Sequence, residues 1–589
     1  MTHRTAVTFT LFLGAAALFV VVPRAQSIQP ADWPQIVRDW EQFERAADPI
    51  AAGMEGDRTA LARLPDTTPE ADARRVAALE SFQSRLAAVD APSLAEADAF
   101  NHAFLVQIVT ERLERAAFDP GRLAFSSEGG PGSLLGYVGR TTSITSREDA
   151  EAWLSRLADT PRLYAEAVAN ARRGLKTGFT QPRSIVESAL EIGLAESAMS
   201  AGDEPLLIPF ASLPDSIPES DQSRLRDRAR TIVAGDIARA RREWVTFLRD
   251  EYLPQARPGL GIGSLKEGRP YYEFLARSFA TTSMTPDEIH EVGRREVARI
   301  RGEMEHEMAA AGFKGSFAEF LQWLRTDPKF YAQSREELLE KASEISKRAD
   351  DRIAALFRRS LPRLPYGVRP VPREIEDQYT TGRYFLGSMA NGVAGGYIVN
   401  TGRLDQRPLY ELPALTLHEA VPGHHLQIAI AQELDEQPWF RRQAFVTAFV
   451  EGWGLYAEFL GNEMGIYRDP YERFGRLSYE MWRACRLVAD TGIHWQGWSL
   501  DEARSCFRDN SALAPHNIET ELQRYVSDPG QALAYKIGEL RFKALRSRAE
   551  QALGDAFDVR DFHDTLLLGG PLPLDMLEQR VDAWLVSKQ

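Results

Sequence analysis

Three histidines and one glutamate lie within eight residues of the chain, at His418, Glu419, His424 and His425. Imidazole nitrogens are common zinc ligands, and a glutamate that follows a ligand histidine is the usual proton acceptor of zinc hydrolases. This cluster therefore predicts a metal site that activates water for hydrolysis, with Glu419 as the general base.

The spacing in this segment differs from the usual H-E-x-x-H motif, in which the two histidines are four residues apart on one helix face. His424 follows His418 by six residues and faces the far side of a regular helix, whereas His425 follows by seven and lies roughly 10 Å along the axis. Pro422 removes the hydrogen bond to the carbonyl of His418, and Gly423 tolerates unusual dihedral angles. We therefore expect a local bulge that brings one of the two histidines back toward His418.

Further motifs accompany this segment. H-E-A-V-P-G-H-H-L-Q at 418–427 is followed by E-G-W-G-L-Y-A-E at 451–458, R-Y at 524–525 and P-G-Q-A-L-A-Y-K at 529–536. In these motifs, and over most of its length, the chain resembles the bacterial domain-of-unknown-function family 885. That family is similar to the helical zinc peptidases of the thimet oligopeptidase and angiotensin-converting enzyme type. The histidine after Pro-Gly is the regular one in the family, so the resemblance favours His424 over His425 as second ligand.

The resemblance also implies the third ligand. Helical zinc peptidases carry a glutamate on the next helix, and Glu451 stands twenty-seven residues after His424. Two histidines and one glutamate leave a position open for water, as catalytic zinc sites do. Glu458 lies two helical turns after Glu451, where it is expected either to orient a ligand histidine or to be a surface charge; His425 is the other candidate for such a role. The same ligand set suits ferrous iron, but a base beside the first histidine favours Zn²⁺, one ion per chain.

Further side chains are candidates for the remaining tasks of a peptidase. Tyrosine and histidine donors stabilise a tetrahedral oxyanion, and arginine or lysine binds a substrate carboxylate. The catalytic candidates are Tyr525, Tyr535 and His516, and the carboxylate-binding candidates are Arg524 and Lys536. For each of them a purely structural role is the alternative.

One short run has strand-like sequence, Gly395 to Asn400, some twenty residues before His418. By resemblance to helical zinc peptidases, we expect an edge strand that pairs with the substrate backbone, with Gly396, Tyr397 and Asn400 in contact with substrate. The alternative is a small hairpin that only packs on the helices.

Most of the remaining sequence is helical in pattern, with apolar residues at three- and four-residue steps. The predicted helices include 71–89, 150–175, 221–253, 286–310 and 335–361, and predicted helix starts lie at Thr145 with Glu148, Thr285 and Ser334 with Glu337. We therefore predict a mainly α protein, a large helical body with a short β-strand or hairpin next to the metal-binding helix. The resemblance to helical zinc peptidases implies in addition a deep cleft, and it implies that residues 27–589 form one metallopeptidase-like unit with a helical half at about 27–375 and a metal-site half at about 376–589.

Composition limits the partners. The 589 residues carry a formal net charge of −14, and no dense basic run stands out, which argues against nucleic acid as a partner. The two cysteines, Cys485 and Cys506, are compatible with one disulfide or with two buried thiols.

The N-terminus resembles a secretory signal. Arg4 precedes an apolar run from Phe9 to Val22, and Ala25 offers a small residue for cleavage, so residues 1–26 are predicted to be removed. A membrane anchor is the alternative, although the run is shorter than the roughly 20 residues of a typical span. We expect an exported protein, periplasmic or secreted, with no stable membrane span after cleavage; its oligomeric state is left open.

These inferences predict a zinc-dependent metallopeptidase that hydrolyses short peptides by Glu419-activated water. Three alternatives stay open. A metalloamidase acting on cell-wall peptides would share the catalytic residues. A non-catalytic peptide-binding protein would retain the fold without a productive metal site, and an iron oxygenase would use the same ligands with ferrous ion.

Overall fold

The protein is described here by a computed structural model that covers residues 32–588, apart from 374–375, 377–378 and 390–391. The predicted signal segment 1–26 lies outside the described residues. No helix within the described part of the chain is long and apolar enough to cross a membrane.

The mainly α prediction is confirmed. The helices before the sheet are α1 (Trp33–Ala47), α2 (Pro49–Met54), α3 (Pro69–Ala87), α4 (Glu96–Ala117), α5 (Pro131–Thr141), α6 (Arg147–Thr177), α7 (Arg183–Ala198), α8 (Glu219–Ile232), α9 (Ala238–Thr246), α10 (Gly268–Ala280), α11 (Pro286–Ala310), α12 (Phe317–Thr326) and α13 (Arg335–Arg352). The strands are β1 (Tyr366–Pro370), β2 (Gly382–Phe385) and β3 (Gly395–Val399). The helices after them are α14 (Leu412–Glu419), α15 (His424–Gln432), α16 (Trp439–Arg442), α17 (Thr447–Glu463), α18 (Pro470–Thr491), α19 (Leu500–Asn510), α20 (Pro515–Ser527), α21 (Ala534–Leu553), α22 (Val559–Leu567) and α23 (Leu574–Lys588).

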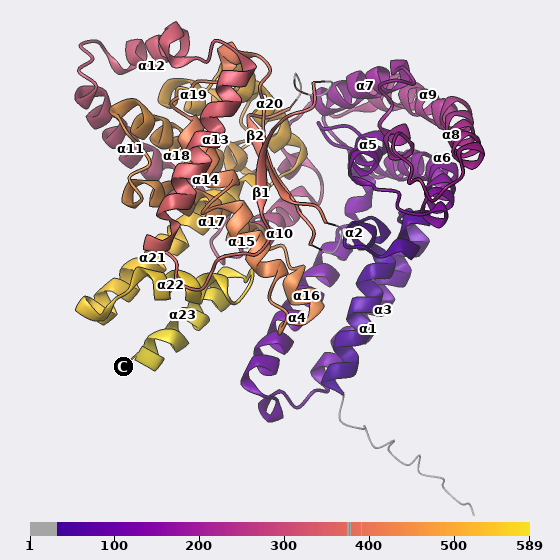
Figure 1. The fold of residues 1–589 in the computed structure, drawn as a ribbon, viewed down its shortest axis with the longest axis horizontal. Coiled ribbons are helices and arrows are strands. Elements are labelled where there is room, and N and C mark those ends of the chain that lie inside the picture. The colour runs from indigo at the N-terminus through magenta and orange to yellow at the C-terminus, as the bar shows by residue number, and fades with distance from the viewer. Residues whose placement is uncertain (1–31, 374–375, 377–378, 390–391, 589) are drawn as a thin grey trace, which may run out of the picture.

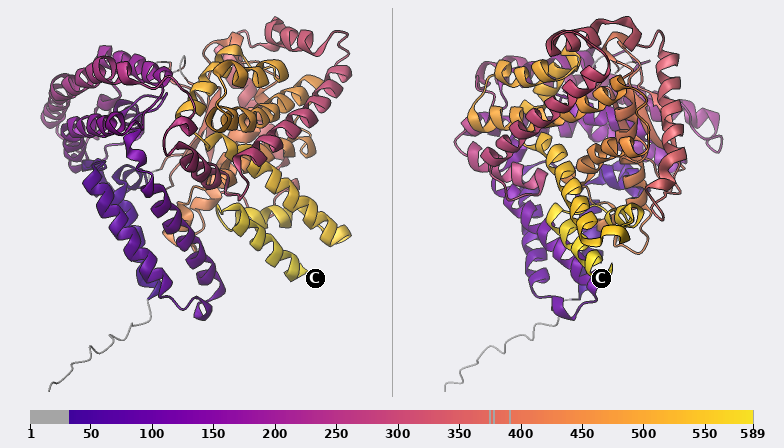
Figure 2. Two further views of the ribbon diagram at one scale, coloured as in Figure 1. Left: turned by 180° about the vertical axis from the view of Figure 1, so that it is seen from behind. Right: turned by 90° about the vertical axis from the view of Figure 1, so that its left-hand side faces the viewer.

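The helices form two groups in space. Helices α1 to α9 lie on one side of the molecule, and α10 to α23 lie on the other with the strands beside them (Figure 1). Figure 2 shows the same grouping from behind. Helix α11 packs along α18, and α13 packs on α14, so helices that precede residue 376 belong with the C-terminal group. One large apolar core includes residues from Trp33 to Leu585 and joins the two groups, and a second, smaller cluster packs around Phe179, Tyr272 and Phe274.

Local capping signals set several helix starts as the sequence predicts. Helix α11 has the predicted bounds, and the hydroxyl of Thr285 accepts a bond from the backbone N–H of Glu288 while the Glu288 carboxylate accepts one from that of Thr285. The predicted start at Thr145 with Glu148 is wrong by one residue, because the reciprocal bonds of α6 join Ser146 and Asp149. Both features satisfy backbone donors that have no partner inside the helix.

Helix α13 ends nine residues earlier than the predicted 361, at Arg352. Contacts from α22 account for the difference. The His563 ring bonds the carbonyl oxygen of Leu356, and the Asp564 carboxylate accepts the backbone N–H groups of Arg359 and Ser360. These tertiary bonds replace the helical ones that the local pattern favours.

The three strands form one small sheet in the order β1-β3-β2. Strand β3 pairs with β1 in parallel and with β2 in antiparallel register, with Tyr397 opposite both Val368 and Tyr384. Strand β3 is therefore the central strand, and β2 is an edge strand. One side of β2 pairs with β3, and its other side pairs with no strand among the described residues.

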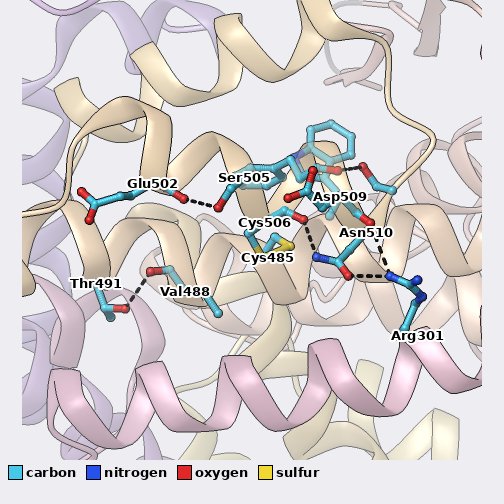
Figure 3. The surroundings of a disulfide bond; sticks show 12 residues. Arg301, Cys485, Val488, Thr491, Glu502, Ser505, Cys506, Asp509 and Asn510 are labelled. Atoms are coloured by element: carbon cyan, nitrogen blue, oxygen red, sulfur yellow. Dashed lines mark hydrogen bonds between the residues drawn. A yellow bond between two sulfur atoms is a disulfide. The ribbon is translucent and has the colours of Figure 1, made fainter. Parts of the chain in front are cut away.

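The two cysteines form a disulfide that joins α18 to α19. Cys485 and Cys506 have a Cα–Cα distance of 5.7 Å, which lies in the range of native disulfides (Figure 3). The side chain of Asn510 donates to the carbonyl oxygen of Cys506, and Arg301 of α11 donates to Asn510. This part of α19 is thus fixed to both α18 and α11.

Candidate metal centre

The chain between His418 and His424 breaks the helix instead of bulging it, which corrects the expected bulge. Helix α14 ends at Glu419 and α15 begins at His424, with a cis Val421–Pro422 peptide between them. A Cβ on Gly423 would lie 2.0 Å from the carbonyl oxygen of His418, so only glycine allows this close approach. The turn places the start of α15 directly beside the end of α14.

This turn is tied to the helix that carries Glu451. The indole N–H of Trp453 donates to the carbonyl oxygen of Pro422 at 2.8 Å, and the Trp453 side chain is fully buried. Glu451 and Trp453 are two residues apart on α17. The E-G-W sequence therefore supplies both a carboxylate and an anchor for the histidine-bearing turn.

His418, His424 and Glu451 come together as a potential metal-binding group, with the ligand atoms all within 4.8 Å of one another. The Nε2 atom of His418 lies 3.4 Å from Oε2 of Glu451, and Nε2 of His424 lies 3.3 Å from the same oxygen. The two imidazole planes are nearly perpendicular, at 83°, with centroids 4.6 Å apart. Both rings thus direct a nitrogen toward one carboxylate oxygen.

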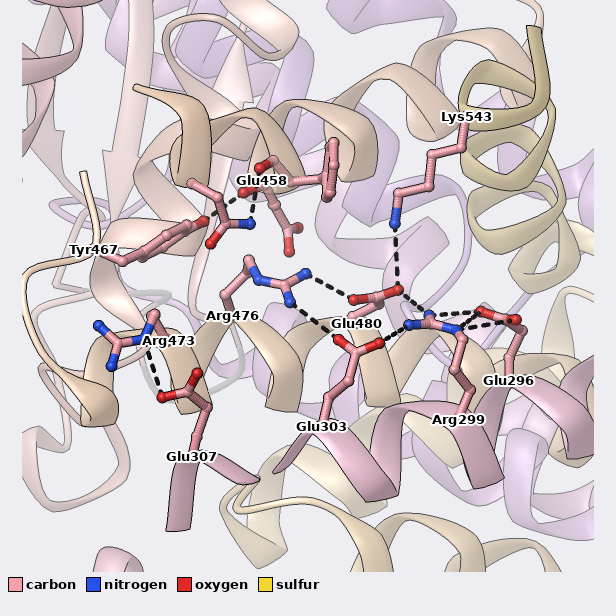
Figure 4. Close-up of polar contacts among 12 residues, drawn as sticks. Glu296, Arg299, Glu303, Glu307, Glu458, Tyr467, Arg473, Arg476, Glu480 and Lys543 are labelled. Atoms are coloured by element: carbon pink, nitrogen blue, oxygen red, sulfur yellow. Dashed lines mark hydrogen bonds and ion pairs between the residues drawn. The ribbon is translucent and has the colours of Figure 1, made fainter. Parts of the chain in front are cut away.

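A second carboxylate holds the first imidazole in place. The Nδ1 atom of His418 lies 2.8 Å from Oε1 of Glu458, which leaves Nε2 for the metal-binding group. Glu458 is buried, and its Oε1 also pairs with Arg483 at 3.2 Å. Its backbone carbonyl accepts a bond from the Tyr467 hydroxyl at 2.6 Å (Figure 4). The structure thus places Glu458 where it orients the imidazole of His418.

The small residue Gly454 completes the support of His418. A Cβ at this position would lie 2.7 Å from Cε1 and 2.9 Å from Nε2 of the His418 ring. The ring therefore packs flat against the backbone of α17, and a larger residue at 454 would displace it.

The electrostatics of the group favour positive charge among its ligand atoms. Burial disfavours the charged imidazole of His418, yet its bonds to Glu451 and Glu458 raise its pKa to about 9. Burial alone would raise the pKa of Glu451, but the neighbouring His424 and His418 hold it well below its ordinary value. Oε2 of Glu451 is buried, and its polar contacts among the described residues are the two imidazoles at 3.3 and 3.4 Å, neither with hydrogen-bond geometry. A buried carboxylate oxygen between two imidazoles fits a divalent cation, and this donor set suits zinc with an open coordination position.

Glu419 lies at the end of α14, next to this group, and contacts β2. The backbone N–H of Tyr384 donates to Oε2 of Glu419 at 2.6 Å. The backbone of Asn400 donates to that of Thr381, so by the alternation of an antiparallel ladder Tyr384 and Tyr397 form a non-hydrogen-bonded pair and the Tyr384 N–H points away from β3. The free edge of β2 therefore faces the glutamate predicted to act as base.

The group opens into a cavity of about 870 Å³. His418, Glu419, His424 and Glu451 all line it, and so do residues 379–386, which include β2. The cavity also borders residues of α5 and of the segment 123–130, so both groups of helices contribute to its walls. Its volume suits a ligand of several residues.

His425 does not join the metal-binding group. Its ring packs on Tyr366 with centroids 4.5 Å apart, and its Nδ1 lies 3.2 Å from the Tyr384 hydroxyl. Burial lowers the pKa of His425 to about 4, so the ring is neutral at pH 7. Of the two candidates for second ligand, the geometry therefore favours His424.

The order of the sheet does not support the predicted substrate contacts of Gly396, Tyr397 and Asn400. Gly396 and Tyr397 belong to the central strand β3 and are buried. The Asn400 side chain donates to the carbonyl oxygens of Glu376, Tyr379 and Thr380. Gly396, Tyr397 and Asn400 do not line the cavity. The strand that lines it is β2, whereas the sequence predicted the strand at 395–400 there.

The remaining candidates differ in their placement. Tyr535 and Arg524 line the cavity. The hydroxyl of Tyr525 is buried against Trp482, Arg486 and Glu521, and Tyr525 is not among the residues that line the cavity. His516 is exposed at the start of α20, outside the cavity, so its position does not support a catalytic role.

Lys536 is also corrected as a substrate ligand. Its ammonium group is fully buried against Glu480 at 2.7 Å, Glu296 at 3.0 Å and Glu539. The buried Glu480 also pairs with Arg476, Arg299 and Lys543, of which only Arg476 is buried (Figure 4). Lys536 therefore neutralises carboxylates inside the protein and does not reach the cavity.

Sequence reasoning missed several residues that line the cavity. These are Tyr379, Arg383 and Tyr384 around β2, and Arg483 and Arg486 on α18. The i, i+3 spacing of the two arginines indicates one helix face, but only tertiary packing shows that this face meets the cavity.

The fold and the site define a mainly α protein with a His-His-Glu group that lines a cavity. The chain belongs to the family described as "Bacterial protein of unknown function (DUF885)", which it matches over residues 49–581. It is similar to the crystal structure of "the putative lipoprotein from Colwellia psychrerythraea", with 27% sequence identity and a TM-score of 0.88, over 94% of this chain and 99% of that chain.

A "putative lipoprotein of unknown function from Shewanella oneidensis" has the same fold. The sequence identity is 18% and the TM-score 0.70, over 93% of this chain and 99% of that chain. No curated protein matches this chain.

Proposed function

We propose that this protein is a zinc-dependent metallopeptidase that hydrolyses short peptides. The observation that carries the proposal is the convergence of His418, His424 and Glu451 at one point of a cavity that Glu419 also lines. Residue types and placement agree with the two-histidine, one-glutamate sites of hydrolytic zinc enzymes. The resemblance to thimet oligopeptidase and angiotensin-converting enzyme adds support to this class of reaction.

The chain's own residues supply the proton chemistry. When bound, zinc supplies Lewis acidity and activates water near neutral pH. Glu419 accepts the proton of the attacking water and returns it to the leaving amine. The Tyr384 N–H holds Oε2 of Glu419, so we assign the proton transfer to Oε1. Tyr535, which lines the same cavity, is the candidate donor to the developing oxyanion.

Short, unstructured peptides are the proposed substrates. A cavity of about 870 Å³ accommodates a few residues of extended chain but no folded protein. Strand β2 lines this cavity as an edge strand, and its outward backbone groups other than the Tyr384 N–H, which bonds Glu419, suit pairing with the main chain of a peptide.

We propose further that the protein works outside the cytoplasm. The N-terminal sequence predicts a cleaved signal, and the two similar structures carry lipoprotein titles. Both cysteines of this chain lie in α18 and α19 and form a disulfide, which is typical of an oxidising compartment.

The test is the metal content of the purified mature chain, measured by elemental mass spectrometry together with peptide turnover. We expect one zinc per chain, lost in the His418→Ala, His424→Ala and Glu451→Ala variants and retained in His425→Ala. Glu419→Gln is expected to keep the zinc and to lose turnover by about 100-fold or more.

Other outcomes would point to the alternative functions. Zinc with turnover of cell-wall peptides only would identify a metalloamidase, and peptide binding that Glu419→Gln leaves unchanged, without turnover in the parent chain, would identify a binding protein. A chain that retains full zinc in His424→Ala contradicts the proposed ligand set.

A further inference from the structure

Two arginines on neighbouring helices line the same cavity as the metal-binding group. Arg486 extends from α18 and Arg524 from α20. The Arg486 side chain is 3% exposed, and that of Arg524 is 20% exposed. Guanidinium groups this far from bulk water need partners, because an unpaired buried charge is strongly destabilising.

Two of the three guanidinium nitrogens of Arg486 have hydrogen-bond partners among the described residues. Its Nε donates to the Tyr525 hydroxyl at 2.9 Å and its Nη2 to Glu521 at 2.8 Å. The ring of Tyr535 lies 4.2 Å from the guanidinium carbon and fixes its plane. The third nitrogen, Nη1, is buried and has no hydrogen-bond partner among the described residues.

Arg524 interacts with Glu521, Tyr525 and Tyr535, yet it too has donors without a partner among the described residues. Its Nη2 lies 3.6 Å from the Glu521 carboxylate, beyond hydrogen-bond distance, and Nε and Nη2 are both buried without a hydrogen-bond partner in the described part of the chain. The two guanidinium groups therefore share one carboxylate, that of Glu521. Asp528 lines the same wall, where burial raises the pKa of its carboxyl and the charge of Arg524 opposes that rise.

This wall of the cavity thus carries two guanidinium groups with unused N–H donors. A carboxylate matches them, since its two oxygens accept parallel bonds from guanidinium groups. Such a ligand would satisfy donors that have no hydrogen-bond partner among the described residues.

We infer that Arg486 and Arg524 bind the C-terminal carboxylate of the peptide whose backbone reaches the metal-binding group. This inference rests on the proposed peptidase function and adds a substrate class to it: peptides with a free C-terminus. The chain would then remove short C-terminal fragments, because the same cavity holds the terminal carboxylate and the residues that cleave the amide.

Binding to the Glu419→Gln variant of the full mature chain tests the inference without turnover. The probes are three sets of N-terminally fluorescein-labelled hexapeptides of mixed sequence: free acids, the same peptides as C-terminal amides, and amides with a glutamate side chain at the last position. We expect the free acids to bind at least about tenfold more tightly than either amide set, as a charge-assisted bond implies.

Variants in the same background localise the effect. Arg524→Gln and Arg486→Gln are each expected to weaken binding of the acids about tenfold and to leave the amides unchanged. Because Arg486 is buried and could be needed for folding, Arg524→Gln carries the decision if Arg486→Gln unfolds. Arg504→Gln is the matched control: this arginine pairs with Glu519 of α20 outside the cavity, and its loss is expected to change nothing.

The inference is overturned if acids and amides bind alike, or if Arg524→Gln weakens both sets equally. Amides with a terminal glutamate side chain that bind as tightly as the acids would show a site for acidic side chains and would also overturn it. Turnover in the parent chain separates the two proposals. Equal hydrolysis of acids and amides keeps the peptidase and rejects the carboxylate site. Acid-selective binding without any hydrolysis keeps the carboxylate site and rejects the peptidase.

Discussion

The carboxylate of Glu458 lies 2.8 Å from Nδ1 of His418, on the side of the ring opposite to the nitrogen that faces Glu451. An imidazole that donates from one nitrogen to a carboxylate is held in the tautomer that binds metal through the other. The orientation of the first proposed ligand therefore depends on a residue that does not itself belong to the metal-binding group.

Glu458→Gln tests this dependence. The substitution keeps the size of the side chain and removes its charge, so we expect zinc affinity to fall about tenfold while the fold is retained. Competition with a fluorescent chelator measures the change. Glu463→Gln, on the exposed end of the same helix, is the control and should bind zinc as the parent does. Equal affinities for all three chains would contradict the assigned role of Glu458.

Gly454→Ala tests the packing of the His418 ring on α17. The added methyl would lie 2.7 to 3.0 Å from three ring atoms, so the ring must move. We expect zinc affinity to fall and the free energy of unfolding to drop by about 1–3 kcal/mol. Gly302→Ala in α11 has no atom within 4 Å of the added methyl, and it should leave zinc binding unchanged. A Gly454→Ala chain with parental zinc affinity would show that the ring has room to shift.

The disulfide between Cys485 and Cys506 gives a prediction for stability. It closes a separation of 21 residues, and loss of such a link lowers the free energy of unfolding by about 3 kcal/mol. We expect Cys506→Ala to unfold at lower urea concentration than the parent, and the parent in reductant to unfold as the variant does. An unfolding midpoint that reductant leaves unchanged in the parent chain would mean that the two thiols are not paired in solution.

Glu411 predicts a pH dependence of stability. Burial raises its pKa to about 8, although Arg407 and Arg325 face it. The unfolded chain has a pKa near 4.3 at this position, so the folded state binds the proton more tightly. This contribution to stability is complete below about pH 4 and is lost as pH rises through about 8. Glu411→Gln removes the titration.

Urea unfolding at pH 5 and pH 9 measures this effect. The parent is expected to lose free energy of unfolding between pH 5 and pH 9 because Glu411 must give up its proton, whereas the Glu411→Gln variant does not bear this loss. The difference in free energy of unfolding between variant and parent should therefore shift in favour of the variant by a few kcal/mol, at about 1.4 kcal/mol per pKa unit. Parallel changes in the two chains would argue against a protonated Glu411 in the folded state.

Much of the fold and the metal-binding group could be predicted from local sequence. The bounds of α11 follow from Thr285-Pro286 and the apolar period of 3.6 residues, because capping bonds form between neighbours in the chain. The choice of His424 and Glu451 came from a resemblance between short motifs. The sequence did not predict that the helix breaks between His418 and His424. The break depends on the close approach of Gly423 to the carbonyl oxygen of His418, which only the three-dimensional backbone shows.

What sequence could not show depends on long-range pairing. Gly395 to Val399 reads as the stronger strand, yet the edge at the cavity belongs to Gly382–Phe385, because strand order is decided by β1 and its parallel pairing. Arg486 likewise reads as one basic residue of an ordinary helix. The proposed carboxylate binding by Arg486 depends on the packing of α18 against α20 and α21, and no local sequence pattern predicts that packing.

The packing of α11 along α18 bears on how this protein can be divided. Helix α18 is buried along most of its length and carries Cys485, Arg483 and Arg486. A fragment that begins near residue 376 would keep every proposed zinc ligand, yet it would strip α18 of α11 and remove the cavity wall at 123–130. The proposed zinc ligands thus lie close together in the sequence, whereas the residues that form the cavity around them do not. A gene fragment or fusion that contains only the metal-binding segment would therefore lack the walls of the cavity.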